Sequence, residues 1–207
     1  MTTRRHVMLG ATGLLAAPGL VATALAAPAV GSPAPDFAGT DTKGAAVRLA
    51  DLRGRTVVLE WWNHQCPFVG KHYGSGNMQA LQKEAAARGA VWIAVQSSAP
   101  GEQGFVSADE ANALMARRTA VPAHVLIDTP GRIGGAYRAT VTPHMFVIGP
   151  DGVLRYMGGI DSIASTRVED IGRATPYARN ALVAVSEGRT PAEATTRPYG
   201  CVIKYAA

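Results

Sequence analysis

The chain has 207 residues, of which 47% are hydrophobic and 17% are charged, and its formal net charge is +5. This composition is typical of one folded domain with a substantial core, and it excludes an intrinsically disordered chain. The basic excess is small and scattered, so the sequence gives little support to nucleic-acid binding.

Residues 1–26 have the pattern of an export signal. Arg4 and Arg5 supply a positive start, an apolar run follows, and small residues at 24–26 suit cleavage by a signal peptidase. The paired arginines resemble a twin-arginine signal. An uncleaved membrane anchor is the alternative, but Pro18 and many Ala and Gly residues make the run weakly hydrophobic. We therefore expect a periplasmic protein that has no membrane attachment after cleavage.

Residues 27–207 are expected to form a single domain in which strands alternate with helices. Apolar, β-branched runs predict strands at 56–62, 90–96 and 123–128, and a hairpin at 145–148 and 153–156. Predicted helices follow Pro67, span 78–88 after an Asn77 cap and 108–118 after a Ser107 cap, and span 168–187 with a division at Pro176. This order predicts a layered α/β domain. An extended segment precedes the sheet, and 190–207 form a C-terminal tail.

Cys66 stands where the first predicted strand ends and a helix begins at Pro67. A helix N-terminus carries partial positive charge and unpaired N–H groups, which favour a thiolate. The alternative is a small buried hydrophobic residue. The polar neighbours Asn63, His64 and Gln65 favour a reactive thiol.

Cys201 is the only other cysteine, and two thiols in an oxidising compartment often pair. The two cysteines therefore form either a structural disulfide or part of the reactive site. A disulfide requires Cα atoms closer than about 7 Å, and the sequence leaves this distance open.

Two further features lie near the predicted site. Glu60 interrupts an apolar strand and is either a proton shuttle beneath the thiol or a carboxylate bonded to Lys, Arg or water. Pro143 begins a predicted strand and is followed by His144. A cis bond there would expose backbone for pairing with an extended thiol substrate, whereas a trans bond would merely start the strand.

Several segments resemble a known family. Residues 30–37 and 51–59 resemble the opening of redoxin domains of the AhpC/TSA type, within the thioredoxin superfamily. Residues 63–79 and 198–205 resemble the bacterial peroxiredoxin-like subgroup, and 141–143 resemble the cis-Pro loop of that superfamily. The resemblance implies an α/β thioredoxin fold, in which helices flank both faces of a central mixed sheet, and redox chemistry carried by thiols.

The chain departs from the best-understood members of this family at two positions. Val69 stands where a thioredoxin Cys-x-x-Cys motif has its second cysteine. Asn63 stands where a typical peroxiredoxin has Thr or Ser, three residues before its reactive cysteine. A local dithiol is therefore missing.

The first functional hypothesis is a peroxiredoxin-like oxidoreductase with antioxidant activity and no cofactor. The Cys66 thiolate would attack a peroxide, Cys201 would condense with the sulfenic acid, and an external thiol would reduce the disulfide. Asn63 and His64 would orient the peroxide as part of the catalytic group. Pro143 and His144 would shape the substrate-binding wall opposite.

Two alternatives remain at this stage. One is disulfide exchange with periplasmic proteins through Cys66. The other is a copper-binding module that uses Cys66 with His64, His72 and His144, because thiolate and imidazole ligands suit that metal.

Overall fold

A computed structural model describes residues 27–206. The predicted export signal lies outside the described residues, so export and cleavage stay predictions. Within the described part of the chain, no helix combines the length and apolar character needed to cross a membrane.

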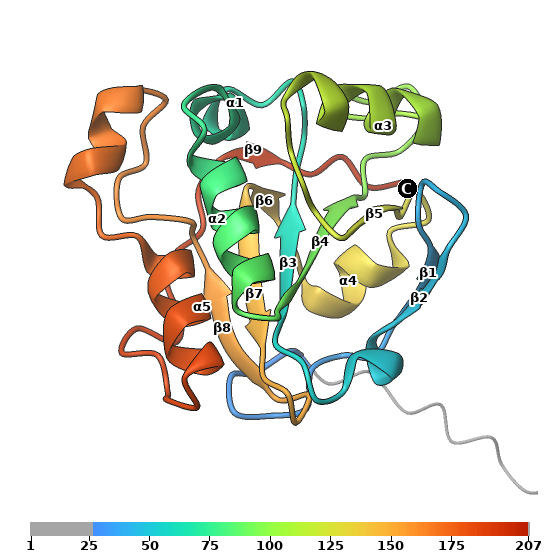
Figure 1. Ribbon diagram of the computed structural model, residues 1–207. Helices are drawn as coiled ribbons and strands as arrows, with labels where there is room; N and C mark the ends of the chain where they lie inside the picture. The colour runs from blue at the N-terminus through green and yellow to red at the C-terminus, as the bar shows by residue number, and fades with distance from the viewer. Residues whose placement is uncertain (1–26, 207) are drawn as a thin grey trace, which may run out of the picture.

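The centre of the fold is a five-stranded sheet with the order β5-β4-β3-β7-β8 (Figure 1). Its strands are β3 Val57–Trp61, β4 Val91–Gln96, β5 His124–Ile127, β7 His144–Ile148 and β8 Leu154–Gly158. β3 and β5 run parallel to β4, whereas β7 is antiparallel to both β3 and β8. The predicted mixed sheet is confirmed, with each predicted strand within two residues of its observed bounds.

The helices and the smaller sheets surround this centre. The helices are α1 Pro67–Gly74, α2 Asn77–Ala87, α3 Ala108–Arg117, α4 Arg132–Tyr137 and α5 Tyr177–Ser186, with 3-10 turns η1 Leu49–Leu52 and η2 Val168–Arg173. Two small antiparallel pairs join β1 Ala38–Thr40 to β2 Ala46–Arg48, and β6 Val141–Thr142 to β9 Cys201–Val202. α4 and β9 were not predicted from the sequence.

Two apolar cores form, one on each face of the sheet. Successive strand residues point to opposite faces, so Trp61 and Trp62 enter different cores. Trp62 lies in the core that α1, α2, α3 and α5 cover, whereas Trp61 lies in the core that α4 and the N-terminal segment cover. The prediction of helices on both faces is confirmed, and this is a thioredoxin fold.

Three helix boundaries predicted from the sequence can be compared with the structure. Ser107 caps α3 and forms a reciprocal capping box with Glu110, as predicted. Pro176 divides the last helical stretch into η2 and α5. The predicted Asn77 cap is wrong, because Gly76, with a left-handed φ of 78°, takes that position. The amide of Asn77 instead lies 2.8 Å from Nδ1 of His72.

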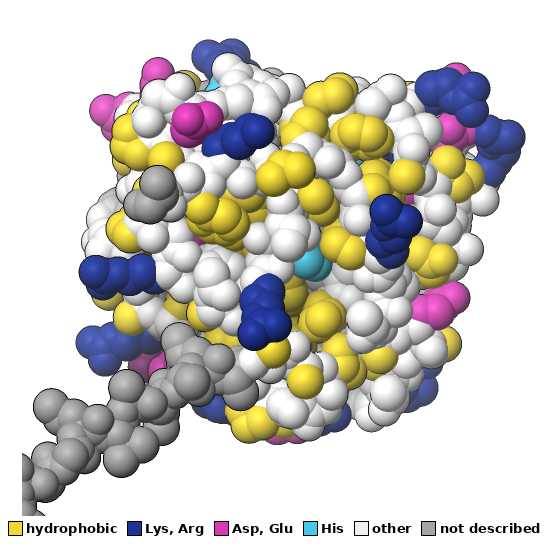
Figure 2. Space-filling view, turned by 180° about the vertical axis from the view of Figure 1, so that it is seen from behind, with side chains coloured by type: hydrophobic (Ala, Val, Ile, Leu, Met, Phe, Trp, Pro, Cys, Tyr) yellow, Lys and Arg dark blue, Asp and Glu magenta, His cyan; other side chains and the backbone are white. Residues whose placement is uncertain are grey.

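The far face of the molecule in Figure 2 shows Lys and Arg side chains at separate points rather than in one patch. This distribution agrees with the scattered positive charge of the sequence.

Phe146 tests the packing of the second core. It is fully buried on β7, with its ring 5.2 Å from that of Trp61 and 5.3 Å from that of Tyr137. We expect Phe146→Ala to lower the free energy of unfolding by about 3–5 kcal/mol in urea denaturation, because it leaves a cavity among large rings. Val121→Ala is the control, since Val121 is 47% exposed. Equal effects of the two substitutions would contradict this packing.

Candidate active site

Cys66 occupies the N-cap position of α1, and Pro67 is the first helical residue, as predicted. The N–H of Gly70 donates to the Cys66 carbonyl at 2.8 Å, which closes the first turn beneath the thiol. The Cys66 side chain is only 1% exposed. The thiol therefore lies at the positive end of α1, but it is covered.

The loop opposite Cys66 contains a cis peptide bond between Thr142 and Pro143. This confirms the cis alternative. The Cys66 Sγ donates to the carbonyl oxygen of Thr142 at 3.1 Å. The predicted wall of the site is therefore the backbone of β6 immediately before Pro143.

Cys201 reaches the same point from the C-terminal tail. In the antiparallel pairing of β6 with β9, Cys201 is the register partner of Thr142. Both cysteines are free thiols, and burial together with the adjacent Cys66 side chain raises the pKa of Cys201 to about 12. The two cysteine side chains are therefore in contact, and Cys201 keeps its proton at neutral pH.

A glycine allows the tail to come this close. Gly200 has a φ of 140°, and a Cβ atom there would lie 1.9 Å from the Thr142 carbonyl oxygen. Beyond Cys201, the N–H of Ile203 donates to the Thr140 carbonyl at 3.0 Å, and the Tyr205 hydroxyl donates to the Ala139 carbonyl at 2.8 Å. The tail is therefore fixed to the loop on the C-terminal side of Cys201.

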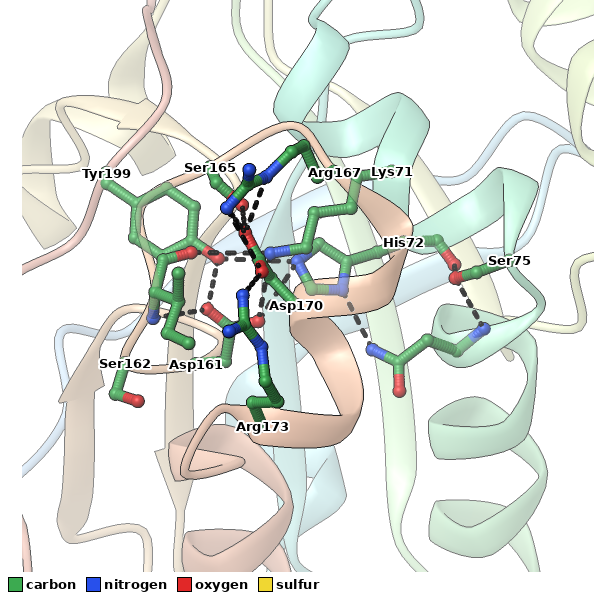
Figure 3. A network of polar contacts seen from close by, with 12 residues as sticks. Lys71, His72, Ser75, Asp161, Ser162, Ser165, Arg167, Asp170, Arg173 and Tyr199 are labelled. Atoms are coloured by element: carbon green, nitrogen blue, oxygen red, sulfur yellow. Dashed lines mark hydrogen bonds and ion pairs between the residues drawn. The ribbon is translucent and has the colours of Figure 1, made fainter.

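A buried polar network fixes the tail on the other side (Figure 3). Asp161, which follows β8, accepts a hydrogen bond from the Tyr199 hydroxyl, and its Oδ2 lies 3.3 Å from Nζ of Lys71. His72 Nε2 lies 3.7 Å from the same oxygen. Burial lowers the pKa of His72 to about 4, because the nearby Asp161 carboxylate, which raises this pKa, does not offset burial and the Lys71 charge. The imidazole is therefore neutral at pH 7. Asp161 and Tyr199 were not predicted as part of the site, because their partners lie far away in sequence.

Asn63 and His64 hold the loop around Cys66. The Asn63 side chain is buried and accepts a hydrogen bond from the Gln65 N–H at 2.8 Å. The His64 carbonyl accepts one from Arg118 at 3.0 Å, and its ring borders a pocket of about 410 Å³ beside α3. Burial, and then Arg118, lower the pKa of His64. The observed contacts of both residues are structural, and their predicted role toward peroxide stays a prediction.

His144 begins β7 and lies beneath the cis-Pro loop. Its ring centroid is 4.4 Å from that of Phe146, and its Nδ1 accepts a long hydrogen bond of 3.4 Å from the Thr140 N–H. Burial lowers the pKa of His144 to about 4. His144 therefore supports the loop from below as a neutral ring.

The copper-site alternative does not fit this arrangement. Across residues 27–206, no group of three or more His, Cys, Asp and Glu side chains is arranged to hold a metal ion. The three histidines expected as copper ligands have different neighbours: His72 faces Asp161, His64 borders the pocket beside α3, and His144 packs on Phe146. The prediction of a copper site made of Cys66, His64, His72 and His144 is therefore wrong for the described residues.

Glu60 is fully buried on β3. Its carboxylate accepts hydrogen bonds from the Tyr73 hydroxyl at 2.9 and 3.1 Å and from Trp92 Nε1 at 2.9 Å. These donors replace the expected Lys, Arg or water partner. Burial raises the pKa of Glu60 to about 7, although the bonds from Trp92 and Tyr73 act in the opposite direction. The proton-shuttle role stays a prediction.

The raised pKa of Glu60 has a measurable effect on stability. The folded carboxyl holds a proton that the unfolded chain, with its ordinary value of 4.5, releases. This stabilisation is complete below pH 4.5 and is lost as the pH rises through 7. Relative to Glu60→Gln, the wild type should lose about 2 kcal/mol between pH 5 and pH 8 in urea unfolding under reducing conditions. A difference between the two proteins that does not change with pH would contradict this.

Comparisons with known proteins agree with this geometry. The model of the AhpC/TSA family matches residues 30–157. The thiol-disulfide oxidoreductase ResA of Bacillus subtilis is 27% identical over 129 residues, which are 59% of this chain and 63% of that protein. The chain thus spans less than two thirds of the length of this curated relative.

Two solved structures are also similar. An uncharacterized conserved protein from Geobacillus kaustophilus has a TM-score of 0.72 and 25% identity, with 86% of this chain and 93% of that chain covered. A putative thiol:disulfide interchange protein DsbE from Chlorobium tepidum has a TM-score of 0.50 and 26% identity, with 63% and 85% covered. With a thioredoxin fold, a cysteine at the start of α1 and a family match over more than half of its length, the chain belongs to the AhpC/TSA family.

Proposed function

We propose that this protein is a thiol-disulfide oxidoreductase that exchanges disulfides with periplasmic proteins through Cys66, with Cys201 as its second thiol. The observation that carries the proposal is the meeting of the two cysteines at Thr142. Because Val69 leaves α1 without a second cysteine, the tail supplies the thiol that a Cys-x-x-Cys motif would hold locally. The names of ResA and the DsbE-like protein support disulfide exchange more directly than peroxide reduction.

The reaction balances with these two thiols alone. The Cys66 thiolate attacks one sulfur of a substrate disulfide, forms a mixed disulfide, and releases the other substrate sulfur as a thiolate. Cys201 then loses its proton to solvent and attacks the Cys66 sulfur, which releases the second substrate thiolate. The substrate gains two electrons, and the protein becomes a Cys66–Cys201 disulfide. An external dithiol restores both thiols by the same exchange.

The raised pKa of Cys201 fits the role of the second thiol. Burial, and then the neighbouring Cys66 side chain, raise the pKa of Cys201 to about 12. Once Cys66 is bonded to a substrate sulfur, the contribution of its thiol to that pKa is lost.

The location and domain boundaries belong to the same proposal. We infer that residues 1–26 direct export and are removed, and that 27–207 form one domain with 190–207 as its tail. An oxidising compartment would supply the disulfide substrates for this chemistry.

Oxidised glutathione and mass spectrometry can test whether Cys66 attacks first and Cys201 second. The reduced mature wild type should lose two hydrogens as the Cys66–Cys201 disulfide forms. Cys201→Ser should stop at one glutathione on Cys66, because the second step is missing. Cys66→Ser should abolish the fast reaction. Rapid formation of a glutathione adduct on Cys201 in Cys66→Ser would contradict the assignment of the nucleophile.

Hydrogen peroxide at the same concentration separates this proposal from the peroxidase hypothesis. Disulfide exchange predicts that oxidised glutathione forms the intrachain disulfide faster than peroxide does. The reverse order, with a sulfenic acid on Cys66 in Cys201→Ser, would favour peroxide as the substrate.

A further inference from the structure

The nucleophile of the proposed reaction is covered by the protein's own tail. Cys66 is 1% exposed, and Tyr199 and Cys201 pack against the core cluster that contains it. A disulfide on another protein cannot reach a thiol this deeply buried. Some part of the cover must therefore move before each exchange.

The tail covers Cys66 in the manner of a bound peptide. An extended peptide can add to a sheet edge through backbone hydrogen bonds. β6 offers such an edge, and within the described residues its strand partner is β9, with Val202 opposite Val141 and Cys201 opposite Thr142. The tail thus places its own cysteine where an extended substrate pairing with β6 would present one.

The attachment of the tail differs on its two sides. After Cys201, backbone bonds join it to the loop at Thr140 and to Ala99, whose N–H donates to the Lys204 carbonyl at 2.7 Å. Before Cys201, the next backbone bonds lie at residues 194–196, where the N–H of Met157 donates to the Ala194 carbonyl and the N–H of Thr196 donates to the Met157 carbonyl, each at 3.1 Å. Between these bonds and Cys201, the tail lines a pocket of about 790 Å³. In this stretch the side-chain bond from Tyr199 to Asp161 lies two residues from Cys201.

Asp161 links the tail to the helix that carries the nucleophile. It binds the Tyr199 hydroxyl and Lys71 of α1 (Figure 3). The Tyr199 ring also packs edge-on against Phe68, with 5.6 Å between the ring centroids. Lys71 and Phe68 lie in the first two turns after Cys66. A change in this contact therefore alters the position of Cys201 relative to Cys66.

We propose that Tyr199 and Asp161 form a latch that holds β9 over Cys66 and opens to admit an extended, cysteine-bearing segment of a protein substrate to β6. When the latch is open, Cys66 and the β6 edge are free, and the mixed disulfide forms. When it closes, Cys201 returns to Thr142 and resolves that disulfide. Tyr199 and Asp161 are positioning residues, and this inference rests on the proposed function.

Alkylation of Cys66 by iodoacetamide tests the latch without any need for redox activity. Every variant in this experiment also carries Cys201→Ser, so that Cys66 is the only thiol. Tyr199→Phe removes the hydroxyl that Asp161 binds and should speed alkylation on the order of tenfold, as expected for the loss of one hydrogen bond to a charged group. Tyr177→Phe is the matched control, because Tyr177 lines the same pocket outside the latch and should leave the rate unchanged.

Gly200→Ala provides an independent route to the open state. The added Cβ would meet the Thr142 carbonyl, so β9 must move from β6 while Tyr199 and Asp161 remain. Alkylation should again accelerate. In the chain that keeps Cys201, both Tyr199→Phe and Gly200→Ala should lower the fraction of Cys66–Cys201 disulfide at a fixed ratio of oxidised to reduced glutathione. A merely structural role for Tyr199 would leave that fraction unchanged.

Wild-type alkylation rates in both Tyr199→Phe and Gly200→Ala would overturn the latch, as would equal acceleration by Tyr177→Phe. A wild-type Cys66 that alkylates as fast in buffer as in denaturant would also overturn it. Each of these results leaves the proposed disulfide exchange standing, because that is judged by the glutathione reaction of Cys66→Ser and Cys201→Ser.

Discussion

The candidate site depends on one short backbone pairing, that of β6 with β9. Each strand has only two residues, yet together they bring Cys201 to Thr142, where the Cys66 thiol also donates its hydrogen bond. A pairing of this length is weak by itself. Side-chain and backbone hydrogen bonds on either side of Cys201 hold this pairing in place. Those bonds determine whether Cys66 contacts Cys201 or a substrate.

Burial accounts for the electrostatics around this pairing. Lys71 and Asp161 form an ion pair in the interior, and removing either partner would leave an uncompensated charge. His72 and His144 are held neutral at pH 7 because their rings are buried. The positive end of α1 and the two thiols therefore share this interior with neutral imidazole rings and a compensated ion pair.

Local signals in the sequence predicted most of the fold, because strands such as β3 and β4 are continuous apolar runs bounded by turns. The same signals placed Cys66 at a strand-to-helix junction. They failed for β9, because a two-residue strand is defined by a partner about sixty residues away, and for α4, where two glycines interrupt a single short turn of helix. The roles predicted for His64 and His144 stay predictions, and closeness to Cys66 in sequence did not reveal that His64 borders the pocket beside α3 or that His144 packs on Phe146.

The most direct test is the disulfide bonding of a protein of residues 27–207 equilibrated in glutathione buffers, read by peptide mapping without reduction. We expect a monomer that carries the Cys66–Cys201 bond across a wide range of buffer ratios, because the tail holds the two thiols together. A protein that shows only glutathione adducts, or only disulfides between chains, would contradict the central claim that these two cysteines form one redox centre.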